Sequence, residues 1–289
     1  MKKLFVLLCV ILIISCSTTP VVQTEDETKE EQVLEEQEQK EPILVNVSKA
    51  RLLVSNSWFP DGDLDEKTIF TYEIDSTDII REETFDAYNE LLDYTEYSYQ
   101  NGNLVLKEYF DSFGELYSGR KYEYSSEGLL IREYFLDEFG DPLTFFDYAY
   151  DESGRKTEWR INSADAGLLA LTEYVYENDI VISVNSYDVN GNMVDSFAYR
   201  YENGNTTEFS HYGSDNDLIN YVEYEYNNGK ISREIKYRMN NQLSKTIGYE
   251  YDGNGNVSRE TVYDSGGNIQ QYFTYEYDFV EVEEWTTDY

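Results

Sequence analysis

The chain is poor in cysteine and histidine, and each shortage excludes a class of site. Its two cysteines are Cys9, inside an N-terminal apolar run, and Cys16, which follows that run. If the run is removed, Cys16 is the single thiol left, so neither a disulfide framework nor a cysteine-ligated metal site can form. His211 is the only histidine, which excludes histidine-rich metal sites and paired-histidine catalysis. The fold must therefore be stable without covalent cross-links.

Basic residues are also scarce. The chain has 22 Lys and Arg against 58 Asp and Glu, a formal net charge of −36. Proteins that bind nucleic acid place basic patches on phosphates, so this charge excludes nucleic acid as a partner. It also disfavours adhesion to anionic lipid headgroups. Any attachment to a membrane then has to come from something other than charge.

Motifs for catalysis, cofactors and metals are missing as well. We find no nucleophile-elbow motif, and every glycine-rich stretch joins two expected strands, so none cradles a phosphate at the start of a helix. Asp61–Asp65 hints at a calcium loop, but Glu66 stands at the position that requires glycine and Tyr72 at that of the bidentate glutamate. We therefore expect no catalytic residues, no cofactor, no metal and no enzymatic activity.

What the chain does have is a repeated Tyr-x-Tyr motif, separated by steps of 25 or 26 residues. A fixed period of this length predicts a repeat architecture. In each copy a turn residue follows the second tyrosine by three residues, or by four where the step is 26, so the extra residue is placed in the turn. The first tyrosines of the eight copies are Tyr97, Tyr122, Tyr148, Tyr174, Tyr199, Tyr224, Tyr249 and Tyr275. Tyr72-Glu73-Ile74 looks like a degenerate earlier copy.

A second turn lies eight residues before each first tyrosine, mostly at Gly or Asn, which tolerate a positive φ. We expect Gly191 to adopt positive φ, and Gly167 beside the misfit Ala166 to indicate a locally shifted turn. Between turns, alternation places both tyrosines on one face of a strand, together with the residues two and six positions before the first tyrosine. The row at six positions is Leu91, Leu116, Pro142, Leu168, Met193, Leu218, Leu243 and Ile269.

These patterns predict an all-β fold, an antiparallel β-meander of about eight 25–26-residue hairpin repeats forming one curled or solenoid-like sheet. An integral outer-membrane barrel needs strands with a continuous apolar face toward lipid. Here a polar residue interrupts the aromatic face in nearly every repeat and the opposite face is charged, so we expect no such barrel.

The N-terminus predicts export. Lys2 and Lys3 precede an apolar run at 4–14 that is too short to span a bilayer. The tetrad Ile13-Ile14-Ser15-Cys16 resembles a bacterial lipobox, which implies cleavage before Cys16 and its lipidation. We expect a signal peptide at 1–15, an acidic disordered tether at 16–43, a cap with a degenerate repeat at 44–88, the repeat array at 89–278, and a capping strand at 279–289.

The repeats "YEYDGNGNV" and "YDSGGNI" resemble the YD repeats of RHS-type proteins, and the likeness spans about 72–278. The resemblance implies a long antiparallel sheet and a non-enzymatic role. This chain departs from the pattern in its longer period, in its few repeats, and in having no toxin or self-cleaving segment after them.

Together these features predict a lipid-anchored protein of the cell envelope, periplasmic or surface-exposed, that acts as a binding or scaffold module. Its partners would be the membrane, through the lipid, and an unknown protein or cell-wall polymer. The alternative is carbohydrate or peptidoglycan binding through the aromatic rows, although most of these tyrosines are expected to be structural. The candidate binding tyrosines are Tyr99, Tyr124, Tyr150, Tyr176, Tyr201, Tyr226 and Tyr251.

Overall fold

A computed structural model describes residues 42–286, and all regular secondary structure in this range is β-strand. The predicted signal peptide, most of the predicted tether and Cys16 lie outside the described residues. Among residues 42–286 no helix has the length and hydropathy needed to cross a membrane. The strands are β1 Ile43–Trp58, β2 Leu64–Tyr72, β3 Ile79–Asp86, β4 Leu91–Gln100, β5 Asn103–Asp111, β6 Leu116–Tyr124, β7 Leu130–Leu136, β8 Pro142–Tyr150, β9 Lys156–Ser163, β10 Gly167–Glu177, β11 Ile180–Asp188, β12 Met193–Glu202, β13 Asn205–Gly213, β14 Leu218–Asn227, β15 Lys230–Arg238, β16 Leu243–Tyr251, β17 Val257–Asp264 and β18 Ile269–Thr286.

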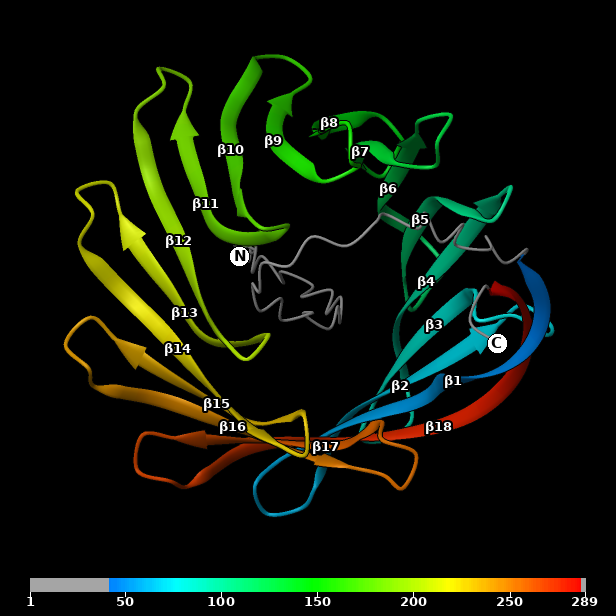
Figure 1. The fold of residues 1–289 in the computed structure, drawn as a ribbon. Coiled ribbons are helices and arrows are strands. Elements are labelled where there is room, and N and C mark those ends of the chain that lie inside the picture. Colours follow the sequence, from blue (N-terminus) through cyan, green and yellow to red (C-terminus); the bar gives the residue numbers. More distant parts are fainter. Residues whose placement is uncertain (1–41, 287–289) are drawn as a thin grey trace, which may run out of the picture. The chain divides into compact units, whose positions relative to one another are not determined.

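The eighteen strands form one closed antiparallel barrel. Each strand pairs with its neighbours in sequence, and β1 pairs with both β2 and β18, so the described sheet has no edge along its wall. Figure 1 shows the ring, with blue β1 beside red β18. The all-β hairpin architecture predicted from the sequence is confirmed, but the open, curled or solenoid-like sheet is wrong. Nine hairpins rather than about eight complete the ring, because residues of the expected cap supply β1–β3 and take part in closure.

Bulges give a physical reason for closure. Each of the eighteen pairings contains one register shift. A bulge adds an unpaired residue to one strand and increases the local twist and bend. Repeated around the sheet, this curvature brings the first and last strands together, and a closed sheet leaves no row of unpaired backbone groups exposed.

The predicted turns are confirmed. In the 25-residue repeats the turn has two positive-φ residues, such as Asn101 (52°) and Gly102 (77°), the pattern of a two-residue type I′ hairpin. The 26-residue repeats have one positive-φ residue, such as Gly128 (83°), so the extra residue does lie in the turn. In the second set of turns Gly191 has φ 78°, and Gly167, not Ala166, takes the positive φ of 76°.

One predicted row of side chains is on the wrong face. The bulge near the start of each even-numbered strand separates the residue six positions before the first tyrosine from the rest of the strand. Leu116 pairs with Phe110 and Leu218 with Tyr212, across a register shift in each case. Strict alternation therefore fails at this point. The row six positions before the first tyrosines pairs with residues of the face opposite to the tyrosines.

Candidate binding surface on the inward face

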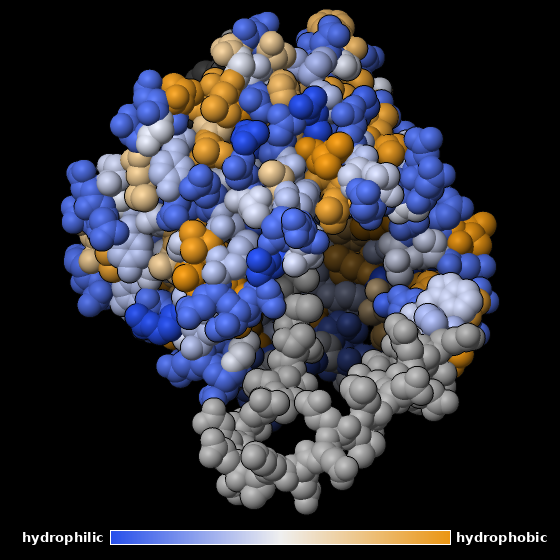
Figure 2. All heavy atoms as spheres, turned by 45° about the horizontal axis from the view of Figure 1, so that its top comes forward, coloured by the Kyte–Doolittle hydropathy of each residue, from blue (hydrophilic) through white to orange (hydrophobic). Residues whose placement is uncertain are grey.

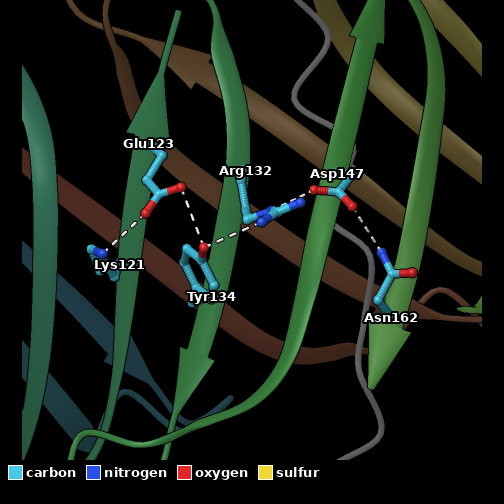
Figure 3. Close-up of polar contacts among 6 residues, drawn as sticks. All are labelled: Lys121, Glu123, Arg132, Tyr134, Asp147 and Asn162. Carbon is cyan, nitrogen blue, oxygen red and sulfur yellow. Dashed lines mark hydrogen bonds and ion pairs between the residues drawn. The ribbon is translucent and has the colours of Figure 1, made fainter. Parts of the chain in front are cut away.

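The two faces of the wall can be told apart at β6–β9. Figure 3 views these strands with the opposite wall of the barrel behind them, and the side chains of Lys121, Glu123, Arg132, Tyr134 and Asp147 lie in front. These side chains therefore point outward. Their neighbours in sequence, including the first tyrosines of the repeats, point into the barrel, because successive side chains in a strand alternate.

The outward face carries a polar network halfway along the strands. Arg132 Nε lies 2.5 Å from Asp147 Oδ1 and Lys121 Nζ lies 3.0 Å from Glu123 Oε1. The Tyr134 hydroxyl donates to Glu123 Oε2 at 3.3 Å. On the side shown in Figure 2, hydrophobic residues form separate patches among hydrophilic ones. The outward surface on this side is thus one that water can solvate.

The second tyrosines are clasps, a term we use for a tyrosine hydroxyl that donates to the backbone carbonyl twenty residues earlier, on the preceding strand. Each acceptor lies at a bulge of an odd-numbered strand, where the ladder is interrupted and a carbonyl needs another donor. Each clasp links the two strands of a hairpin at the end opposite to its turn. The nine clasps, with distances of 2.7–3.0 Å, are Tyr72, Tyr99, Tyr124, Tyr150, Tyr176, Tyr201, Tyr226, Tyr251 and Tyr277.

All seven tyrosines predicted as a binding face are therefore clasps, and each has its hydroxyl engaged. Their role as ligand contacts stays a prediction. Tyr72 is also a clasp, donating to Leu52 O at 2.8 Å. The prediction that Tyr72 begins a degenerate copy is off by one position in the motif, because Tyr72 corresponds to the second tyrosine and Phe70 to the first.

The first tyrosines line the middle of the inward face, where several donate to carboxylates. Tyr97 donates to Glu82 at 2.5 Å, Tyr148 to Glu133 at 3.0 Å and Tyr249 to Glu234 at 2.8 Å. Burial, followed by the bond and charge of the carboxylate, raises the pKa of these tyrosines well above 10. At neutral pH their hydroxyls therefore remain protonated donors.

Along β8–β13 the inward face is aromatic instead. Phe146 contacts Trp159, with ring centroids 5.1 Å apart, and Phe197 stacks on Phe209 at 5.4 Å and on His211 at 4.5 Å. His211 thus makes a cross-strand contact with Phe197. Trp159 Nε1 and His211 Nε2 are shielded from solvent and have no hydrogen-bond partner. Burial raises the pKa of Tyr199 in this sector to about 12.

Sequence reasoning placed Arg120 on the tyrosine face, two positions before Tyr122, but missed the two inward lysines. Lys107 pairs directly with Tyr97 and with Arg120, so both cations belong to the inward face. Lys156 lies with its Nζ 4.3 Å from the centre of the Tyr148 ring. The spacing along the sequence is a signal that could have found Lys107. The residue that pairs with each first tyrosine on the inward face follows it by ten positions in a 25-residue repeat and by eleven in a 26-residue repeat. The inward partners of successive repeats are Lys107, Glu133, Trp159, Val184, Phe209, Glu234 and Glu260.

Adjacent basic and acidic residues in the odd-numbered strands point to opposite faces. Arg132 points outward and Glu133 inward, whereas Lys107 points inward and Glu108 outward. Among residues 42–286 no group of three or more His, Cys, Asp or Glu residues is arranged to hold a metal ion. An open pocket of about 610 Å³ at β14–β16 is lined in part by Lys236, Arg238 and Lys245.

The interior of the barrel is not a dry core. In the described part of the chain no large side chain is completely buried, and only Phe146, Val184, Val222 and Val280 are hydrophobic residues exposed by less than a tenth. Barrels of 16–18 strands are too wide for their own side chains to fill. The inward face therefore offers half-buried aromatic and charged groups that water and a ligand can reach.

Comparisons with known proteins concern the fold alone. No protein-family model and no curated protein matches the chain. Similar solved structures include the Photorhabdus luminescens Tc holotoxin pore, with 14% identity over 72% of this chain and a TM-score of 0.35. They also include a porin-like protein from Bacteroides uniformis, with 11% identity over 78% of this chain and 96% of the other and a TM-score of 0.43. A porin-like protein from Bacteroides vulgatus matches with 10% identity over 80% of this chain and 99% of the other and a TM-score of 0.33. The chain spans 12% of the toxin chain, and likenesses this weak carry no argument about function.

Proposed function

We propose that this chain is a lipid-anchored, extracytoplasmic protein of the cell envelope that binds or scaffolds a partner without catalysis. The N-terminal basic residues, the short apolar run and Cys16 support export and lipidation. The regular Tyr, Asp, Asn and Gly positions support a place among YD-type repeat proteins. Such a protein would hold its barrel outside the cytoplasm through the acidic segment that follows Cys16.

The single observation that carries the binding role is the inward face of the closed barrel. It combines aromatic rings with carboxylates and cations, and none of its large side chains in the described residues is completely buried. A wall built only for stability would bury a hydrophobic core. The ligand surface we propose is therefore the interior of the barrel.

The outward face supports attachment through the lipid rather than through the wall. Arg132–Asp147 and Arg200–Glu208 are ion pairs on strands of this face, at 2.5 and 2.7 Å. Charged side chains at the middle of a lipid-facing strand are destabilising by about 2–4 kcal/mol for Arg and Lys. We therefore place the barrel wall in water and assign membrane attachment to Cys16.

The second candidate is carbohydrate binding, favoured by the aromatic sector of β8–β13. Aromatic rings such as Phe209 and Tyr199, with centroids 5.1 Å apart, offer apolar faces on which sugar rings stack. The clasp tyrosines contribute less to this candidate, because their hydroxyls are engaged in holding the wall together.

Retention of the full chain on purified cell-wall polymer tests this proposal. Tyr199→Leu removes an inward ring, Tyr187→Leu removes an outward ring on the adjacent strand, and Tyr201→Leu removes a clasp. We expect Tyr199→Leu to reduce retention several-fold while Tyr187→Leu leaves it unchanged. Tyr201→Leu should lower the melting temperature without a selective loss of retention. Equal retention of all three variants and the wild type would contradict an interior binding surface.

Membrane fractionation tests the anchor separately. Cys16→Ser removes the thiol that would carry the lipid, so the protein should move from the detergent-soluble membrane fraction to the soluble fraction, or remain as uncleaved precursor. Since acyl chains contribute about 0.8 kcal/mol per buried methylene, the shift should be nearly complete. Unchanged membrane attachment of this variant, with normal cleavage of the precursor, would contradict the proposed lipidation of Cys16.

A further inference from the structure

A strip of three cations crosses the inward face between β5 and β9, in a protein whose net charge is −36. Lys107 on β5 pairs directly with Arg120 on β6, and Lys156 opens β9 beside Tyr150 of β8. Neighbouring strands lie about 4.8 Å apart, so the strip extends over four strand spacings, about 19 Å along the wall. We call these three residues the cation strip.

The carboxylate within the strip forms an ion pair with only one of the cations. Glu133 is 7% exposed. Its Oε1 lies 2.8 Å from Arg120 Nη1, and its Oε2 accepts the Tyr148 hydroxyl at 3.0 Å. Both oxygens are thus occupied. In the described residues neither Lys107 nor Lys156 has a carboxylate within ion-pair distance, although the charge of Glu133 acts on both lysines and that of Glu82 on Lys107.

Tyrosine rings hold the two lysines in place. Lys107 Nζ lies 4.5 Å from the centre of the Tyr97 ring and 3.5 Å from its hydroxyl oxygen. Lys156 Nζ lies 4.3 Å from the centre of the Tyr148 ring and 6.0 Å from that of Tyr174. Burial lowers the pKa of both lysines, and this effect outweighs the opposing charges of Glu82 on Lys107 and of Glu133 on both. Both side chains are only half-buried, so a ligand can approach each ammonium group.

A wall built only for stability would not keep two unpaired, half-buried charges beside abundant acidic residues. Desolvating a charge disfavours the folded state unless a partner restores its interactions. Outward cations of the same strands do have partners, since Lys121 pairs with Glu123 at 3.0 Å and Arg132 with Asp147 at 2.5 Å. Within β5–β9, the two cations without a direct ion pair are thus on the inward face, where an anionic ligand can pair with them.

We propose that the cation strip binds a polymer that carries carboxylate or phosphate groups at intervals, with its sugar or polyol units packed against the rings of Tyr97 and Tyr148. A strip of about 19 Å is too long for one small anion but matches several units of a polymer chain. Arg120 can still donate to an anion, because its guanidinium has five N–H groups. This inference names the ligand class of the interior surface and so rests on the proposed function.

Calorimetric titration of the full chain tests the strip with three probes of similar length. These are an oligogalacturonate, which carries carboxylates, an oligomer of glycerol phosphate, and a neutral chitin oligosaccharide. Lys107→Met and Lys156→Met remove the charge and keep much of the side-chain volume, whereas Lys107→Arg retains it. Lys121→Met is the matched control, because Lys121 is next to Arg120 but faces outward. Melting temperatures verify folding, and methionine should not lower them, since it removes an unpaired charge.

We expect at least one anionic oligomer to bind, and the carboxylate and phosphate probes to tell which group the strip prefers. Each methionine variant should weaken that binding ten-fold or more, and Lys107→Arg and Lys121→Met should bind like the wild type. Raising the salt concentration should weaken binding as well. Three outcomes would overturn the proposed role of the cation strip. These are wild-type affinity in both methionine variants, equal affinity of the wild type for the neutral oligosaccharide, and no binding of either anionic probe. Retention on whole cell-wall polymer, measured in parallel, shows whether the proposed function fails with it or stands.

Discussion

The two tyrosines of each Tyr-x-Tyr motif have different roles. In the Tyr224-Glu225-Tyr226 copy, the pKa of Tyr224 is raised chiefly by burial and then by the charge of Glu234. Tyr226 instead donates its hydroxyl to Thr206 O at 2.8 Å. Both rings lie on the inward face, because side chains two apart share a face. The first tyrosine is thus placed at the candidate binding surface and the second completes the backbone hydrogen bonding.

At this scale we predict the effect of removing one clasp. Tyr226→Phe keeps the ring and deletes the donor, leaving the Thr206 carbonyl at its bulge without that partner. The free energy of unfolding should fall by about 1–3 kcal/mol, the cost of an unsatisfied, partly buried acceptor. Denaturant titration measures it. Tyr221→Phe is the control, since Tyr221 faces outward and stacks on Tyr237 with centroids 4.7 Å apart. Equal stability of both variants and the wild type would show that the clasp contributes nothing.

The hairpin is the repeating element, and its turns follow from local chemistry. Asp188 Oδ1 accepts the backbone N–H of Asn190 at 2.8 Å and of Asn192 at 2.9 Å, while Gly191 supplies the positive φ. The same arrangement recurs at other aspartates such as Asp111 and Asp264. These bonds to its own turn lower the pKa of Asp188, so the carboxylate stays ionised at neutral pH.

This element gives a prediction about backbone strain. Gly191 has φ 78°, and a Cβ added there would meet nothing within 4 Å, so any cost of Gly191→Val comes from the backbone conformation. A β-branched residue in the left-handed region should destabilise the fold by more than about 1 kcal/mol. Ala166→Val should cost less, because the neighbouring Gly167 carries the positive φ in that turn. Thermal unfolding compares the two, and a larger effect at Ala166 would contradict the register of this turn.

At the scale of the whole molecule, closure depends on one contact between the ends of the chain. β1 and β18 pair over most of their lengths, from Ile43↔Thr286 to Trp58↔Tyr272. On the outward face Asn56 Nδ2 lies 3.4 Å from Thr274 Oγ1 and Trp58 Nε1 donates to the same oxygen at 3.0 Å. These residues are more than two hundred positions apart, so forming the contact has a high loop-closure entropy and is expected late in folding.

A disulfide between these strands tests closure. In a Cys9→Ser, Cys16→Ser background, Asn56→Cys with Thr274→Cys should oxidise spontaneously and change mobility in non-reducing gels. Because the bond would close a loop of more than two hundred residues, it should stabilise the fold by up to about 5 kcal/mol. Asn56→Cys with Thr246→Cys is the control, since Thr246 lies on β16, three strand spacings from β1. A cross-link that forms no faster in the first pair than in the control would show that the sheet is open.

The sequence by itself determined the hairpin. Period, turn type and the position of the extra residue in the 26-residue repeats all depend on φ preferences and hydrogen bonds within a few residues, as Asn101-Gly102 and Gly191 show. The alternation between bulges likewise follows from strand geometry, and it placed both tyrosines of each copy on one face.

Only the tertiary structure decided where the bulges fall, which tyrosine is a clasp and whether the sheet closes. A bulge moved Leu116 to the outward face although the sequence alternates without interruption. The clasps became visible only when Tyr226 met Thr206 O on a neighbouring strand. Closure depends on twist summed over eighteen strands and on pairing between β1 and β18, and no stretch of sequence contains either quantity. The cation strip has the same origin, because Lys107, Arg120 and Lys156 share a wall only once their strands are in register.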